Sequence, residues 1–345
     1  MIEQADVASL QTLRRWNGAI YHGNKELVFA RRRDGYVREC HGDLHLGNVA
    51  LVDGHPLIFD CIEFSDDLRW IDVMSEVAFL TMDFDYHGRA DLAWRFIDRY
   101  LQHTGDYKGL ALLRYYQAYR AAVRAKIAAL RGAQSGLERA EATRKKTEAR
   151  DRLQQACAYT DVRPLSVTIT RGLSGCGKTT ITDTLLQRTG SIRLRSDVER
   201  KRMHGLSTQA QSASALDGGL YSRDATGATY EQLQKLTEVV LRAGFSVIVD
   251  ATFLDRVRRD AFRSLARSHD ATFKILDIGA DEQLLRERVA QRARSRTDAS
   301  EATVSVLERQ LKSADVLAAE ELADVVHVDG GVSIDWRDLT RRLYA

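Results

Sequence analysis

The chain has 345 residues, of which 44% are hydrophobic and 29% charged, as is ordinary for a globular protein of two domains. Its formal net charge of +3 is too small to predict a nucleic-acid or membrane-surface partner. No apolar run approaches the roughly 20 residues of a membrane span, and the N-terminus lacks the basic and apolar regions of a signal peptide.

The cysteines at positions 40, 61, 157 and 176 form neither a CxxC pair nor a zinc-ligand spacing. Reduced thiols of this kind are typical of the cytosol. We therefore expect a cytoplasmic protein that does not enter a membrane.

Residues 4–16 are predicted to form a helix, and the short apolar run 27–30 is predicted to form a strand. The segment HGDLHLGN, residues 41–48, follows. In it an Asp is followed five positions later by an Asn, which is the spacing of a kinase catalytic loop. In such loops the Asp accepts the proton of a substrate hydroxyl and the Asn binds a metal. Residues 49–59 predict a β-hairpin that ends at Asp60.

The motif HGDLHLGN, followed by the hairpin and by FDCIEF at residues 59–64, resembles the aminoglycoside phosphotransferase family, whose members have a protein-kinase-like fold. The resemblance extends over residues 1–135. It implies that Asp43 is the catalytic base and that Asn48 and Asp60 are metal ligands, with His41 bracing the loop.

A kinase fold also requires an N-terminal lobe with a glycine-rich loop and a strand-borne lysine. Only 40 residues precede His41, and they contain no G-x-G-x-x-G and a single lysine, Lys25. We therefore expect a C-terminal kinase-like lobe alone. Two interpretations stay open: a catalytically silent lobe, or one that retains weak metal or nucleotide contact.

Residues 91–130 show helical periodicity, and their apolar positions predict a core. Residues 136–163 are charged and rich in helix formers, so we expect an exposed helical linker. Pro164 closes this linker, and residues 164–345 are then expected to form a second domain.

The second domain begins with an apolar strand at 165–170, then the sequence GLSGCGKT at 172–179, then a helix. Strand, glycine loop and helix is the order of a phosphate-binding P-loop, and a glycine-rich turn that matches by chance is the alternative. Loop amides and the helix N-terminus attract polyphosphate. The lysine would reach the β- and γ-phosphates, and Thr179 would hold Mg²⁺. The candidate ATP-binding residues are Gly172, Leu173, Ser174, Gly175, Cys176, Gly177, Lys178, Thr179 and Thr180.

Further strands are predicted at 191–197, 245–250, 273–278 and 325–328, alternating with helices. This alternation predicts an α/β fold with a parallel sheet flanked by helices. Asp197 and Asp250 fall at strand ends, where ligands bind in such sheets. Asp197 is a candidate to contact the acceptor hydroxyl, or else a helix cap; Asp250 is a candidate Mg²⁺ ligand through water, or else a turn residue.

Residues 286–296 contain five arginines ahead of a Thr-Asp-Ala-Ser turn. Phosphoryl transfer requires cations on the migrating group. Arg292 and Arg296 are therefore candidate catalytic residues, followed by Arg288; a solvated basic helix face is the alternative. The Gly-, Ser- and Ala-rich stretch 205–228 is expected to form a loop that shapes a substrate pocket.

GLSGCGKTT, Ser196-Asp197, Val249-Asp250-Ala251-Thr252 and the arginine segment resemble the small P-loop kinases over nearly all of 165–330. These kinases include gluconate kinase, chloramphenicol phosphotransferase, polynucleotide kinase and the zeta toxins. In this likeness an acid after the second strand contacts the acceptor hydroxyl, which is the role of Asp197 here.

The sequence thus predicts an ATP- and Mg²⁺-dependent phosphotransferase that acts on a hydroxyl of a small molecule. Lys178, Asp197, Arg292 and Arg296 are its candidate catalytic residues. A nucleotide-dependent regulatory module and a polynucleotide 5′-kinase are the alternatives. The acceptor and the oligomeric state stay open.

Overall fold

The computed structural model describes residues 4–208, 210, 223–295 and 303–344. The chain divides into two compact units. The first comprises residues 1–97 and 108–163, and the second comprises residues 98–107 and 164–345. The end of one helix from the first half of the sequence is therefore part of the second unit.

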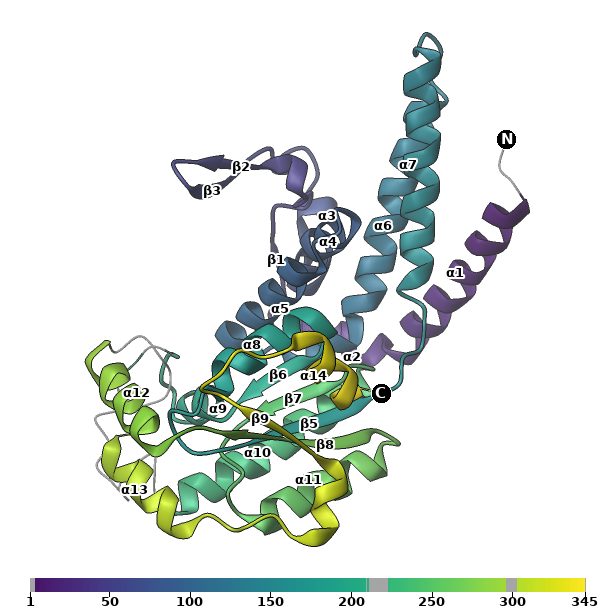
Figure 1. Cartoon of the computed structure of the whole chain (residues 1–345). Coiled ribbons are helices and arrows are strands. Elements are labelled where there is room, and N and C mark those ends of the chain that lie inside the picture. The colour runs from purple at the N-terminus through teal and green to yellow at the C-terminus, as the bar shows by residue number, and fades with distance from the viewer. Residues whose placement is uncertain (1–3, 209, 211–222, 296–302, 345) are drawn as a thin grey trace. The chain divides into compact units, whose positions relative to one another are not determined.

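The first unit is mostly helical (Figure 1). Its elements are α1 (Gln4–Gly23), α2 (Lys25–Arg33), β1 (Val37–Glu39), the 3₁₀ turn η1 (Leu46–Asn48), β2 (Val49–Val52), β3 (His55–Ile58), α3 (Asp66–Arg69), β4 (Trp70–Asp72), α4 (Val73–Tyr86), the first part of α5 (Ala90–Thr104), η2 (Tyr107–Gly109), α6 (Leu110–Gly132) and α7 (Arg139–Ala158).

The strand predicted at residues 27–30 is wrong, because these residues lie inside α2. A run of four apolar residues does not distinguish strand from helix. Arg31, which lies in the same helix, forms a buried ion pair with Asp72. Buried Arg31 donates to both carboxylate oxygens of Asp72, at 2.7 and 2.8 Å. Asp72 also caps α4 by accepting from the amide of Met74 at 2.8 Å.

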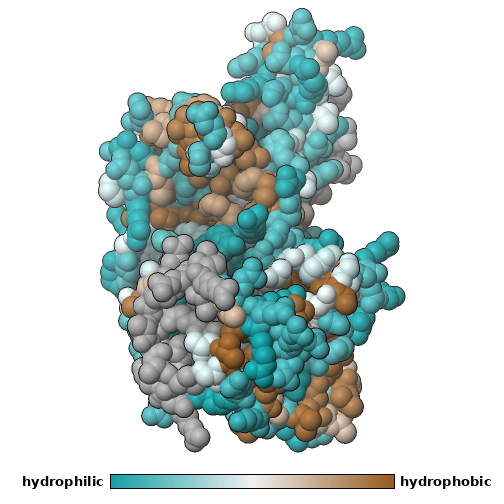
Figure 2. All heavy atoms as spheres, turned by 60° about the vertical axis from the view of Figure 1, so that its left-hand side comes forward, coloured by the Kyte–Doolittle hydropathy of each residue, from teal (hydrophilic) through white to brown (hydrophobic). Residues whose placement is uncertain are grey.

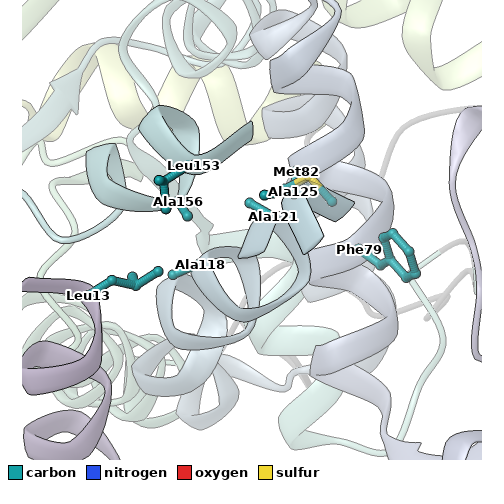
Figure 3. Packing of buried hydrophobic residues seen from close by; sticks show 8 residues of the cluster. All are labelled: Leu13, Phe79, Met82, Ala118, Ala121, Ala125, Leu153 and Ala156. Carbon is teal, nitrogen blue, oxygen red and sulfur yellow. The ribbon is translucent and has the colours of Figure 1, made fainter. Parts of the chain in front are cut away.

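The core of the first unit lies between α1, α4, α6 and α7 (Figure 3). Leu13, Phe79, Met82 and Leu153 supply large side chains, and alanines of α6 and α7 let the helices approach closely. Residues 136–163 were expected to be an exposed linker. In the structure α7 instead packs along α6, and its Arg152 donates to Asp83 at 2.7 Å with both side chains 3% exposed.

The hairpin predicted at residues 49–59 is confirmed as the antiparallel pair β2–β3. Apolar side chains of this hairpin and of the residues after it stay exposed, notably Leu51 at 76% and Phe64 at 84%. Figure 2 shows apolar surface in this part of the first unit. These residues are therefore no part of the core.

The second unit is built on a five-stranded sheet in the order β6–β7–β5–β8–β9, with every pair parallel. This confirms the predicted α/β fold. Its elements are β5 (Ser166–Arg171), α8 (Lys178–Thr189), β6 (Ile192–Arg195), α9 (Ser196–Met203), α10 (Arg223–Arg242), β7 (Val247–Asp250), α11 (Arg256–Ser268), β8 (Thr272–Gly279), α12 (Glu282–Ser295), α13 (Val304–Ser313), η4 (Ala319–Asp324), β9 (Val325–Asp329) and α14 (Trp336–Tyr344).

Helices cover both faces of this sheet (Figure 1). Helices α8 and α14 lie on one face, and α10 and α11 lie on the other. Strands β5 and β7 are buried because helices cover both faces of the sheet. Strands β6, β7 and β5 are neighbours, so their carboxyl ends lie side by side at one edge.

Among the described helices, none is both long enough and apolar enough to cross a bilayer.

Candidate functional site

The glycine loop joins β5 to α8 at the centre of the sheet. Gly172 and Gly175 have φ of 153° and 91°. A Cβ atom at Gly172 would lie 2.5 Å from the carbonyl oxygen of Ile278, and one at Gly175 would lie 2.9 Å from that of Leu285. Other side chains would clash there, so the loop conformation depends on glycine at both positions.

Lys178 is the first residue of α8. Its Nζ donates to the carbonyl oxygens of Gly172 and Leu173, at 3.0 and 2.8 Å. The ammonium group therefore lies over the loop whose amides would bind phosphate. Cys176 is 1% exposed, and its Sγ lies 3.7 Å from the same Nζ, so it fills space inside the loop.

Thr179 and Asp250 meet at the start of α8. The Thr179 hydroxyl donates to Oδ2 of Asp250 at 2.9 Å, and Thr182 donates to the same oxygen at 3.4 Å. Asp250 is the last residue of β7 and is 5% exposed. A hydroxyl and a carboxylate oxygen are hard donors of the kind that Mg²⁺ takes, together with water and phosphate oxygens. These residues therefore fit Mg²⁺.

Asp197 was predicted at the end of a strand, but β6 ends at Arg195 and Asp197 lies in the first turn of α9. Asp197 is not the N-cap of this helix either, because Arg195 occupies the N-cap position of α9. Oδ1 of Asp197 instead accepts from Nη1 of Arg200 at 2.9 Å, one turn further along the helix.

These side chains line one cavity of about 1450 Å³. Lys178, Thr179 and Asp250 contribute to its wall, as does Asp197. Thr180 at the start of α8 and Trp336 at the start of α14 also line it. Single ligand sites typically enclose about 300–1,000 Å³. The cavity is therefore large enough for a nucleotide together with a second small molecule.

The arginine segment is only partly described. Arg288 lies in α12 and donates through both Nη atoms to the carbonyl oxygen of Gly330, at 3.1 Å each. It also lies 3.4 Å from the carbonyl oxygen of Gly175. Arg292 falls within α12, but its side chain lies outside the described residues, as do Arg296 and residues 211–222 of the predicted pocket loop.

Several residues of the cavity wall were not found from the sequence. The backbone amide of Ser174 donates at 2.9 Å to Oε1 of Gln310, which lies in helix α13. Arg258 lies over the ring of Tyr230, with its guanidinium carbon 4.1 Å from the ring centroid. Gln310, Arg258 and Tyr230 belong to no motif, and only the folding of distant segments brings them to the cavity.

In the first unit, the structure brings Asp43 and Asn48 together. Nδ2 of Asn48 donates to the backbone oxygen of Asp43 at 3.0 Å and lies 3.4 Å from its Oδ2. A hydrogen bond from His45 is the main cause of a lowered pKa of Asp43. Nε2 of His41 lies 2.8 Å from the carbonyl oxygen of Phe59, and its role as a bracing residue stays a prediction.

Asp60 is exposed and has a positive φ of 61°. Over the described ranges, no group of three or more His, Cys, Asp or Glu side chains is arranged to hold a metal. The metal site implied by the aminoglycoside phosphotransferase resemblance therefore stays a prediction, as does the resemblance itself.

A parallel sheet with the glycine loop after its central strand defines the second unit as a P-loop nucleotide-binding domain. Residues 167–317 match the family model AAA_33, described as an AAA domain. Proteins of Mycobacterium tuberculosis and Mycobacterium bovis, both named as uncharacterised, are 32% identical to the chain over 278 residues. The match covers 80% of this chain and 54% of each relative, so the chain spans about half of their length.

Solved structures that match part of the chain include a gluconokinase from Sinorhizobium meliloti, with a TM-score of 0.36 and 20% identity over 52% of this chain and 90% of that one. A sugar kinase from Janibacter sp. has a TM-score of 0.38 and 20% identity, over 52% of this chain and 92% of that one.

Proposed function

We propose that the chain is an ATP-dependent phosphotransferase that moves the γ-phosphoryl group to a hydroxyl of a small molecule. The observation that carries the proposal is that Lys178, Thr179 and Asp250 line the same cavity as Asp197. A nucleotide switch needs the first three residues, but it has no need of a second carboxylate in a cavity of about 1450 Å³.

The roles follow from the chemistry of each group. Loop amides and Lys178 bind the phosphates, and the apolar side chains of Ile334 and Trp336 suit a nucleobase. Thr179 and Asp250 would hold Mg²⁺, which neutralises charge on the β- and γ-phosphates when it is bound. Asp197 orients the acceptor hydroxyl and accepts its proton.

The transfer itself is a displacement at the γ-phosphorus. The acceptor oxygen forms a bond to this phosphorus while the bond to the β,γ-bridging oxygen breaks, and ADP leaves. The acceptor proton passes to a carboxylate oxygen of Asp197. The guanidinium groups of Arg200 and Arg288, which both line the cavity, would offset the negative charge of the migrating group. Arg292 and Arg296 are proposed for the same task.

The experiment is transfer of labelled γ-phosphate from ATP in the presence of Mg²⁺. Its acceptor panel contains sugars, sugar acids, aminoglycosides, nucleosides and DNA 5′-ends. A labelled product that is lost in Lys178→Ala supports the proposal and identifies the acceptor class. A product formed only on DNA would point to a polynucleotide 5′-kinase. ATP hydrolysis with no product across the panel would favour a regulatory module.

A further inference from the structure

The segment from Asp98 to Tyr107 belongs to the second unit, although 56 residues of the first unit, 108–163, separate it from the rest of that unit. It contains the end of α5 and the start of η2. Its buried side chains contact Arg193, which donates to Thr179 of the cavity wall, and Glu199, which precedes Arg200 of that wall in α9.

On the side of the glycine loop, the contact runs through Arg193 of β6. Its Nε and Nη2 donate to the two carboxylate oxygens of Asp98, at 3.2 and 2.8 Å, with side chains 1% and 3% exposed. Nη1 of Arg193 donates to the backbone oxygen of Thr179 at 3.0 Å. The same nitrogen donates to the hydroxyl of Thr182 at 3.3 Å.

Thr182 in turn donates to Oδ2 of Asp250, the carboxylate oxygen that Thr179 also contacts. Asp98 is therefore linked through Arg193 and Thr182 to both residues that fit Mg²⁺. A buried, bidentate Arg–carboxylate pair fixes the direction of the guanidinium group. The pair between Asp98 and Arg193 thereby directs Nη1 of Arg193 towards the first turn of α8.

On the side of the acceptor, the contact runs through Glu199 of α9. The hydroxyl of Tyr107 donates to Oε1 of Glu199 at 2.8 Å, and both residues are 1% exposed. Arg202 donates to the same Glu199 oxygen and, through Nη2, to the carbonyl oxygens of Leu101 and Gln102, at 3.1 and 2.6 Å. These contacts fix the helix that contains Asp197.

We propose that residues 98–107 are a positioning element of the phosphotransfer site. Asp98 holds the turn that contains Thr179, and Tyr107 holds the helix that contains Asp197. This inference rests on the proposed function where it is tested by ATP turnover. Where it is tested by Mg²⁺-dependent ATP binding, it does not. Activity of the P-loop unit then depends on a piece of chain that lies before residue 164.

The binding experiment uses the full chain, ATP and a series of Mg²⁺ concentrations. We expect Asp98→Asn to raise the Mg²⁺ concentration needed for half-maximal ATP binding by about tenfold, because small displacements of positioning groups have effects of this size or larger. ATP binding in EDTA should change little. Asp324→Asn is the matched control, since Asp324 accepts from Arg263 at 3.0 Å and does not line the cavity.

The turnover experiment compares a tyrosine of this segment with a tyrosine of the first unit. Tyr107→Phe should lower kcat for ATP turnover by about tenfold while the affinity for Mg·ATP stays constant, because Asp197 is displaced and the loop is not. Tyr159→Phe is the control, since the Tyr159 hydroxyl donates at 2.7 Å to Asp85 within the first unit and does not line the cavity. This control should keep the wild-type kcat.

Thermal unfolding of every variant shows whether the variant is folded. Asp98→Glu retains the charge, so the Mg²⁺ concentration that it needs for half-maximal ATP binding should lie between those of the wild-type protein and Asp98→Asn. Wild-type Mg²⁺ dependence in a folded Asp98→Asn, or equal effects in Asp324→Asn, would overturn the proposal. If the wild-type protein turns over no ATP, the proposed function fails, whereas the Mg²⁺ dependence of ATP binding still decides this inference.

Discussion

The hydroxyl of Thr179 donates a hydrogen bond of 2.9 Å to Oδ2 of Asp250 and thereby joins the first turn of α8 to the end of β7. The two residues are 71 positions apart in the sequence. They meet because β5 and β7 are parallel neighbours, so that the loop after one strand lies beside the end of the other. A nucleotide and its metal ion would be held at this junction.

The first prediction concerns Lys178. Lys178→Ala should reduce ATP turnover by about a hundredfold or more, because it removes the ammonium group that is proposed to bind the phosphates. Asp43→Ala should change turnover little, since Asp43 belongs to the first unit. Steady-state ADP release measures both variants. Equal losses in the two would contradict the assignment of the working site to the P-loop unit.

The second prediction concerns Asp197. Asp197→Asn retains the shape of the side chain and removes the carboxylate that would accept the proton. Phosphoryl transfer should fall by about 10²–10⁴-fold, which is the usual contribution of a general base. Titration with ATP should show unchanged affinity, because the phosphate-binding loop is intact. A weakened ATP affinity with unchanged kcat would instead assign Asp197 to nucleotide binding.

The third prediction concerns Gln310, whose side chain accepts from the Ser174 amide of the glycine loop. A phosphate oxygen that binds this amide must displace Gln310. Gln310→Ala should therefore strengthen ATP binding by about fivefold, which corresponds to a hydrogen bond of about 1 kcal/mol. Isothermal titration with ATP measures this change.

Lys312→Ala on the same helix is the control for Gln310→Ala, because Lys312 does not line the cavity. It should bind ATP as the wild-type protein does. Weaker ATP binding by Gln310→Ala would mean that Gln310 contacts the bound nucleotide rather than competing with it.

The sheet and the phosphate-binding loop could be predicted because their signals are local. A β-branched apolar run, a glycine pattern and a helix follow one another within residues 165–189. Parallel strands also align their carboxyl ends, so the meeting of Thr179 and Asp250 followed from the topology. The strand predicted at 27–30 is wrong because four apolar residues do not distinguish a strand from a helix, and these residues lie inside α2.

The rest of the site depends on long-range contacts that no local pattern encodes. Gln310 reaches Ser174 across 136 positions, and Asp98 reaches Arg193 across 95. The helical periodicity of residues 91–130, which include most of α5, predicted that their apolar side chains lie in a core of the first domain. It could not indicate that the end of this helix belongs to the other unit. The same limit applies to α7, whose charged composition predicted an exposed linker.

The last prediction concerns stability at low pH. Nε and Nη2 of Arg259 donate to the two carboxylate oxygens of Glu321, at 2.7 and 2.9 Å, and both side chains are 0% exposed. The hydrogen bonds from Arg259 are the main reason that the pKa of Glu321 falls from 4.5 to about 2. The folded-state pKa lies below the unfolded one, so this stabilisation is complete above pH 4.5 and is lost as the pH falls towards 2.

The shift corresponds to about 3 kcal/mol at neutral pH. Glu321→Gln should lower the free energy of unfolding at pH 7 by about 3–5 kcal/mol, because Arg259 is left charged and buried. It should also flatten the decline in stability between pH 4.5 and 2. Urea unfolding across this range measures both effects. Glu282→Gln, which removes one of the two carboxylate partners of exposed Arg286, should keep the wild-type pH profile. An unchanged acid decline in Glu321→Gln would show that other carboxylates govern it.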